Sequence, residues 1–196
     1  TIGATAGRPS IDRAAGRLLE ARFRLGMFDP EELVAYAAIG PEVVHCAAHR
    51  QLALAAARSS IVLLKNEGAL LPLGRDQVNS VAVVGPTAES VRVLLGNYFG
   101  YSGQYVTPFE GIVEAVSVGT QVWRAEGCKV GGQDRRGFAE AVRLARQAEV
   151  VVACCGYSPE LEGEEGEVEQ EAGTGDRPHI GLPGLQEELL QELAAA

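Results

Sequence analysis

The sequence lacks both a long apolar run and a basic cluster. Its longest apolar runs, at 61–64 and 150–155, are of strand size, and a transmembrane helix needs about 18–20 residues. Lysine and arginine are not clustered, and the formal net charge is −9. Because nucleic-acid-binding proteins present a basic face, we expect neither a nucleic-acid partner nor a membrane partner.

Cysteine patterns and nucleotide motifs are also missing. The four cysteines, Cys46, Cys128, Cys154 and Cys155, have neither zinc-ligand spacing nor the density of a disulfide framework. Adjacent strand residues point to opposite faces, so Cys154 and Cys155 are not expected to bond to each other. After the apolar run 81–84, Gly85-Pro86-Thr87 lacks the G-x-G-x-x-G spacing of a dinucleotide site. We therefore predict no cofactor and no metal.

Acidic residues are abundant in one place, the segment 156–183. It follows the β-forming run 150–155 and contains seven glutamates with no lysine or arginine between them: Glu160, Glu162, Glu164, Glu165, Glu167, Glu169 and Glu171. Ligands of open α/β sheets bind outside the carboxyl ends of the strands, so a carboxylate loop at this point is suited to proton chemistry. The competing interpretation is a charged surface loop held open by its own repulsion.

The first seventy residues have helical patterns. Ser10 is predicted to cap a helix that Gly26 ends, with apolar positions at Ile11, Ala14, Leu18, Ala21 and Leu25. An alanine-rich helix is expected over 47–58. The apolar run in 61–66 is interpreted as a short buried strand or a helix end, and Pro72 ends regular structure. A boundary follows near residue 75.

Beyond this boundary the pattern changes to alternating strands and helices. Strands are expected at 80–86, 121–125 and 150–155. Between the last two, a covering helix has an apolar stripe formed by Phe138, Ala141, Val142 and Ala145. Pro183 is expected to start another helix, with Leu185, Leu189 and Leu193 on one face. The alternation predicts the α/β class with a mostly parallel sheet.

Several strings resemble glycoside hydrolase family 3 and occur in that family's order. The segment 24–29 resembles its R-x-G-x-F-D string, and 56–66 followed by 70–73 resembles A-R-x-x-x-V-L-L-K-N and L-L-P-L. The segment 81–86 resembles the first strand of the family's α/β sandwich. The segments 95–98 and 106–112 resemble its L-G-N-Y and V-T-P-x-x-G-I strings. The segments 156–165 and 176–186 resemble G-x-S-P-x-L-E-G-E-E and D-R…L-P…Q.

The resemblance implies a domain organisation. Residues 1–30 would be the end of a catalytic β/α barrel, including its last helix, 31–75 a linker and helix, and 76–196 an incomplete α/β sandwich. Because the chain begins at Thr1 and stops inside a helical pattern, we expect it to be a fragment of a secreted or periplasmic enzyme. The missing barrel domain of the same chain would be its partner.

The resemblance also implies a reaction, the retaining hydrolysis of a terminal β-linked xylose or glucose from an oligosaccharide. Such enzymes use one carboxylate as nucleophile and a second as acid/base. The family places the nucleophile on the barrel, so this chain alone is expected to be inactive. Matching L-E-x-E assigns the acid/base role to Glu162, with Glu169 and Glu171 as alternates, because E-x-E also occurs there. Glu164, Glu165, Asp176 and Arg177 would support it or contact the sugar.

Other residues and another class of function remain open. Tyr98, Tyr101 and Tyr105 lie in a glycine-rich segment, where stacking on sugar competes with ordinary packing. The three histidines, His45, His49 and His179, have no triad or metal spacing. The alternative to an enzyme is a non-catalytic carbohydrate- or cation-binding α/β module.

Overall fold

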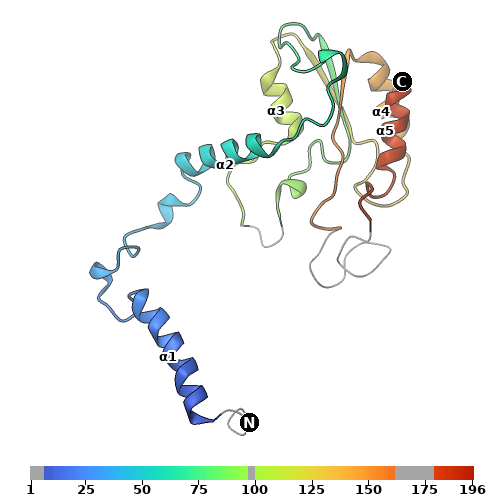
Figure 1. Ribbon diagram of the computed structural model, residues 1–196. Coiled ribbons are helices and arrows are strands. Elements are labelled where there is room, and N and C mark those ends of the chain that lie inside the picture. The colour runs from blue at the N-terminus through green and yellow to red at the C-terminus, as the bar shows by residue number, and fades with distance from the viewer. Residues whose placement is uncertain (1–6, 97–99, 162–178) are drawn as a thin grey trace. The chain divides into compact units, whose positions relative to one another are not determined.

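A computed structural model describes residues 7–96, 100–161 and 179–196. The chain divides into two units, residues 1–63 and 64–196 (Figure 1). Within the described residues, no helix is both long and apolar enough to span a membrane.

The first unit contains the helices α1 (Arg8–Arg24) and α2 (Ala47–Ser60), with short 3₁₀ helices at Glu31–Leu33 and Pro41–Val43 between them. The predicted cap at Ser10 is wrong, because α1 begins after Gly7, and Ser10 lies inside its first turn. Pro9 explains the earlier start, since its fixed φ and missing N–H suit a first helical turn. Gly26 stands just beyond the end of the helix, as expected, with φ +69.

The helices of the first unit bury none of their residues. Leu18 on α1 is 56% exposed and Leu52 on α2 is 68% exposed. The ring of Phe23, near the end of α1, lies 4.6 Å from that of Phe28, which follows the helix. The amphipathic patterns of this unit therefore form helices without forming a core in the described residues.

The run 61–66 is neither a buried strand nor a helix end, so this expectation is wrong. It has no regular structure, and Leu64, at its centre, is 92% exposed. A strand needs a neighbour to satisfy its peptide groups, whereas the described strands pair among themselves. Instead, the Asn66 side chain fixes the next turn: its Nδ2 donates to Leu71 O at 2.8 Å and its Oδ1 accepts from Leu71 N at 2.9 Å.

The second unit is built on a parallel sheet of the strands β1 (Ser80–Val84), β2 (Gln121–Ala125) and β3 (Val150–Ala153), in the order β2-β1-β3. All three strands were expected, although β1 and β3 end two residues earlier than predicted. Every residue of β1 is buried, as is typical of a parallel strand covered on both faces. In register, Val84 pairs with both Ala125 and Ala153, so the three strands end together at one edge.

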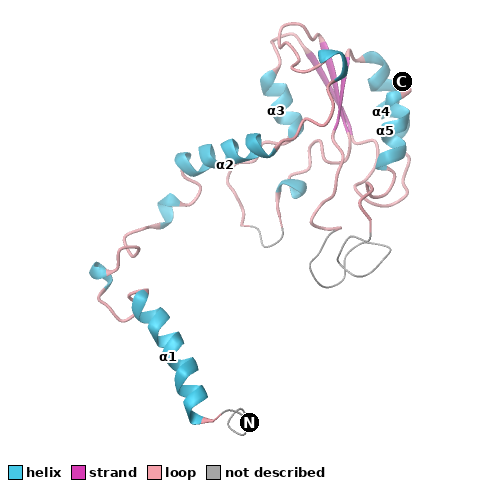
Figure 2. Cartoon of the chain, viewed as in Figure 1, coloured by secondary structure: helices cyan, strands magenta, loops and turns pink. Residues whose placement is uncertain are grey.

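Helices cover both faces of this sheet (Figures 1 and 2). The helices α4 (Phe138–Gln147) and α5 (Gln186–Ala194) pack on one face, and α3 (Pro108–Ala115) packs on the other. The first core contains Ala82, Val84, Ala125, Phe138, Ala141, Leu144, Leu185 and Leu189. Phe138 and Ala141 of the predicted α4 stripe and the leucine face of α5 supply this core, but Val142 is only half-buried and the unpredicted Leu144 takes its place. Helix α5 begins three residues after Pro183, the expected start.

The sequence patterns did not predict α3. A capping box holds its start: Glu110 N donates to Thr107 Oγ1 at 3.3 Å, and Thr107 N donates to Glu110 Oε2 at 2.8 Å. The signal was present as Thr-Pro-Phe-Glu, an S/T-x-x-E pattern with proline at the first helical position.

Candidate functional site

The carboxyl edge of the sheet borders a cavity of about 480 Å³. Segments that follow all three strands line it: Pro86 and Ser90 after β1; Glu126, Lys129, Val130, Gly131 and Gly132 after β2; Ser158, Glu160 and Leu161 after β3. This is the place where open α/β sheets bind ligands. The cavity therefore lies where the sequence predicts a site, at the start of the acidic segment.

A glycine allows the segments after β1 and β3 to approach closely. Gly85 has φ +129, and a Cβ on it would lie 2.0 Å from the carbonyl oxygen of Cys154. Gly85 N donates to Ala125 O at 3.0 Å, and Cys154 N donates to Val84 O at 2.7 Å. The turn after β1 is thus a tight structural turn, consistent with the missing nucleotide motif.

Two side chains tie the described residues at the start of the acidic segment to those at and beyond its end. Gln186, the first residue of α5, is 0% exposed, and its amide binds both backbone groups of Gly156. The hydroxyl of Tyr157 donates to Gly181 O at 3.1 Å. Residues 156–157 and 181–186 are therefore neighbours, although the seven glutamates at 160–171 lie between them in sequence.

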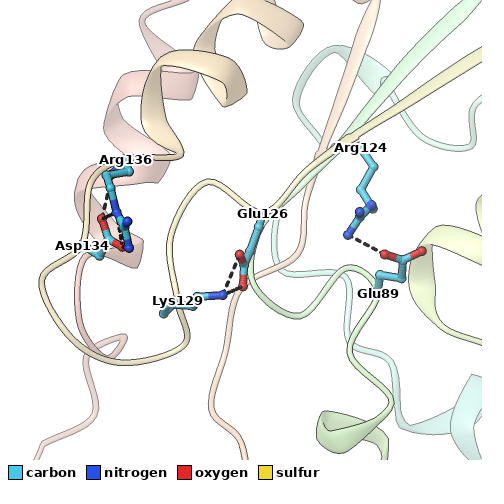
Figure 3. Close-up of polar contacts among 6 residues, drawn as sticks. All are labelled: Glu89, Arg124, Glu126, Lys129, Asp134 and Arg136. Atoms are coloured by element: carbon cyan, nitrogen blue, oxygen red, sulfur yellow. Dashed lines mark hydrogen bonds and ion pairs between the residues drawn. The ribbon is translucent and has the colours of Figure 1, made fainter.

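Charged side chains in and near the cavity wall form pairs (Figure 3). Lys129 Nζ lies 2.8 Å from Glu126 Oε1, and Arg124 pairs with Glu89. Beyond the drawn residues, Arg92 Nε donates to Glu160 Oε1 at 2.8 Å. Both side chains of this last pair are about half exposed (56% and 49%), so it contributes at most about 1 kcal/mol. The carboxylate of Glu160 is thus paired with the guanidinium of Arg92.

Two titratable residues in the segments that follow β2 and β3 have pKa values unsuited to catalysis. Asp134 accepts hydrogen bonds from Arg136, chiefly from its side chain, which lowers the pKa of Asp134 from 3.8 to about 2. It is therefore ionised at neutral pH and is not a proton donor. Burial raises the pKa of the Cys155 thiol to about 11, with smaller contributions from Cys128 and Cys154, so Cys155 is not an activated nucleophile.

The hydroxyl of Ser158 is the one buried side-chain polar atom without a hydrogen-bond partner among the described residues. Ser158 is 5% exposed and lines the cavity. The described ranges contain no group of three His, Cys, Asp or Glu side chains placed to hold a metal ion.

The predicted site residues all lie outside the described residues, in 162–178. These are Glu162, Glu164, Glu165, Glu169, Glu171, Asp176 and Arg177, and their roles stay predictions. The structure places instead the residues on either side of them. Sequence reasoning gave no role to Tyr157 or Gln186, because a contact across 24 or 30 residues has no local pattern.

Of the other candidates, Tyr98 also lies outside the described residues. Tyr101 is 84% exposed, so the packing interpretation is wrong for it. Tyr105 is half-buried, and its hydroxyl accepts from Ser102 N at 2.7 Å. His45, His49 and His179 are exposed.

Comparison with known proteins identifies the family. Residues 61–196 match the family model for the glycosyl hydrolase family 3 C-terminal domain. The chain belongs to glycosyl hydrolase family 3. The α/β fold of its second unit is the fold of that C-terminal domain, as the sequence strings implied.

Relatives of this family 3 chain are named as β-xylosidases and β-glucosidases. A probable β-D-xylosidase 7 of Arabidopsis thaliana is 39% identical over 95% of the chain and 23% of its own length. A solved family 3 exo-β-xylosidase in complex with a xylobiose aziridine activity-based probe has a TM-score of 0.80 at 32% identity. The alignment covers 98% of this chain and 23% of that one.

A solved β-glucosidase of Erythrobacter marinus has a TM-score of 0.78 at 33% identity, over 95% of this chain and 27% of its own. The family 3 chain thus spans about a quarter of the length of the relatives that it matches.

Proposed function

We propose that this family 3 chain supplies the acid/base carboxylate of a retaining, exo-acting β-glycosidase. Glu162 is the acid/base residue, and Glu164, Glu165, Asp176 and Arg177 support it or contact the sugar. The nucleophilic carboxylate belongs to a β/α barrel domain of the same protein. The substrate is an oligosaccharide with a terminal β-linked xylose or glucose, and the enzyme acts in the periplasm or outside the cell.

One observation carries this proposal: the acidic segment leaves the sheet at its carboxyl edge, and the described residues on its two sides are tied together. The bond from Tyr157 to Gly181 and the bonds between Gly156 and Gln186 make it a loop with a fixed base. A fixed base suits a residue that must meet a second carboxylate at about 5–5.5 Å across a domain boundary.

The local chemistry supports a glutamate in this role. The acid/base residue must be protonated to donate to the leaving oxygen, and then ionised to take a proton from water. Nearby carboxylates raise the pKa of a glutamate toward this range. The acidic segment supplies such neighbours at 164, 165, 167, 169 and 171.

Xylose is the favoured sugar. Its relatives include a β-xylosidase of Formosa agariphila and a probable β-D-xylosidase of Arabidopsis thaliana, and the strings Leu-Gly-Asn-Tyr and Ser-Pro resemble the xylosidase branch. Glucose is the second choice, because a β-glucosidase shares the fold at 33% identity.

The test uses the protein that contains this sequence together with its barrel. Hydrolysis of aryl β-xylosides and β-glucosides with good and poor leaving groups is compared for the wild type and Glu162→Ala. We expect a selective loss on poor leaving groups, of about 10²-fold or more, and restoration of turnover by azide on good ones.

Glu169→Ala and Glu171→Ala are the matched controls, since each removes one carboxylate from the same segment. Unchanged rates in Glu162→Ala, with the signature in a control, would transfer the role to that glutamate. A wild type inactive on every glycoside would instead favour the carbohydrate- or cation-binding module.

A further inference from the structure

Gln186 is the only fully buried polar side chain in the described residues, and its amide makes three hydrogen bonds. Its Oε1 accepts from Gly156 N at 2.7 Å. Its Nε2 donates to Gly156 O at 2.8 Å and to Val130 O at 2.8 Å. Because two partners are carbonyls and one is an N–H, only one orientation of the amide satisfies all three.

These three bonds join the segments that surround the cavity. Val130 follows β2 and lines the cavity. Gly156 follows β3 and stands six residues before Glu162, and Gln186 opens α5 after the acidic segment. One side chain therefore sets the position of the loop base relative to both the cavity wall and the helix.

Gln186 is itself held by well-packed neighbours. Leu185 is 5% exposed and Leu189 is 0% exposed, and both belong to the core shared with β1 and α4. These two leucines fix the start of α5, from which the Gln186 side chain extends. Through Gln186, Gly156 is thus held next to the packed core of the second unit.

We propose that Gln186 is a positioning residue for the acid/base glutamate. This inference rests on the proposed function. The amide fixes the base of the loop so that the glutamate meets the glycosidic oxygen, and a displacement of about 1 Å at such a site can cost about 10²-fold in rate. The carboxamide contacts backbone only and takes no part in the chemistry.

The experiment measures kcat and kcat/KM on aryl β-xylosides with good and poor leaving groups, in the protein that contains this sequence and its barrel. Gln186→Leu removes all three bonds at similar volume, and Gln186→Glu keeps the shape but loses both donors at neutral pH. Gln191→Leu, an exposed position on the same helix, is the matched control. Thermal melting identifies the temperatures at which each variant is folded.

We expect Gln186→Leu to lose about 10²-fold in kcat/KM on poor leaving groups and less than about threefold in kcat/KM on good ones, and Gln191→Leu to behave as wild type. Gln186→Glu places a carboxyl against the carbonyl oxygens of Val130 and Gly156, so its loss should be at least that of Gln186→Leu when it is ionised and should shrink at acid pH, where the protonated carboxyl donates one hydrogen bond. In the double variant with Glu162→Ala, the losses should not add, because both changes act on one proton transfer.

Equal losses of kcat/KM on both leaving groups, or additive losses in the double variant, would overturn the positioning role and leave the proposed function intact. If Gln186→Leu does not fold, the same comparison of kcat/KM losses on poor and good leaving groups is made with Gln186→Glu. Absence of the leaving-group signature in Glu162→Ala is the separate result that overturns the proposed function, and with it the positioning of Glu162.

Discussion

The two units of this chain use apolar residues in opposite ways. In the first, α1 and α2 have amphipathic patterns yet bury no residue. In the second, every residue of β1 is buried, and α4 and α5 place their apolar stripes on the same core. A helical pattern therefore predicts a helix but not its packing, whereas a sheet with covering helices provides its own interior. The match to the family 3 C-terminal domain begins at residue 61, close to residue 64, where the second unit begins.

Matched glycine substitutions should give the largest contrast between the units. Gly85→Ala places a Cβ 2.0 Å from the carbonyl oxygen of Cys154 at φ +129, and we expect it to lower the free energy of unfolding by about 4 kcal/mol or more. Gly16→Ala lies in α1 with no atom within 4 Å of the new Cβ, and it should stabilise that helix by about 0.5–1 kcal/mol.

Urea unfolding followed by Trp123 fluorescence reports on the second unit, because Trp123 packs on its core. Far-ultraviolet circular dichroism reports on the helices. A Gly85→Ala transition that coincides with wild type would contradict the close approach of β1 and the segment after β3.

Leucine truncations should give the next largest contrast. Leu189 on α5 is 0% exposed, and Leu189→Ala should cost about 2–5 kcal/mol through lost burial and a cavity. Leu52 on α2 is 68% exposed, and Leu52→Ala should change stability by at most about 0.5 kcal/mol. Equal costs in chemical unfolding would show that the first unit has a core after all.

Helix starts give a smaller contrast. Thr107→Ala removes the capping box of α3 and should cost about 1 kcal/mol in the urea transition. Ser10→Ala should cost almost nothing, because α1 begins after Gly7 without a side-chain cap bond. If Ser10→Ala proved the costlier of the two, the cap expected from the sequence would be restored.

The smallest effect concerns acid stability. The Arg136 side chain lowers the pKa of Asp134 from 3.8 to about 2, so the pair stabilises the folded state above pH 3.8. This stabilisation is lost as the pH falls through about 2. Asp134→Asn should therefore flatten the pH dependence of unfolding between these values.

Glu20→Gln, which removes the exposed Glu20–Arg24 pair of α1, is the control and should leave the Trp123 transition unchanged. Glu149 and Glu110 also have lowered pKa values, through hydrogen bonds from Asn79 and Thr107. Their contribution is lost at acid pH in the same direction, so an unchanged slope in Asp134→Asn would assign the acid sensitivity to them.

The strands could be predicted from the sequence because their signal is local. Apolar runs at 80–86 and 150–155 have the length of buried strands, and β2 was placed to the residue. The run 61–64 is equally apolar but has no partner strand among the described residues, which no local pattern reveals. The sequence pattern placed the cap at Ser10, but α1 begins earlier, at Arg8, because Pro9 suits its first turn. A loop after β3 was predicted from the sequence. The hydrogen bond between Gly156 and Gln186 was not, because 30 residues separate the two in sequence and only the fold brings them together.

The strand order has a practical consequence for work with the 196-residue chain. Among the described residues, β3 pairs with β1 on one side only. The peptide groups along its other side form an open edge next to half-buried valines, and such an edge is a template on which a strand from another chain can add. A charged substitution such as Val151→Lys would discourage such strand addition only at the expense of the core that Val151 joins.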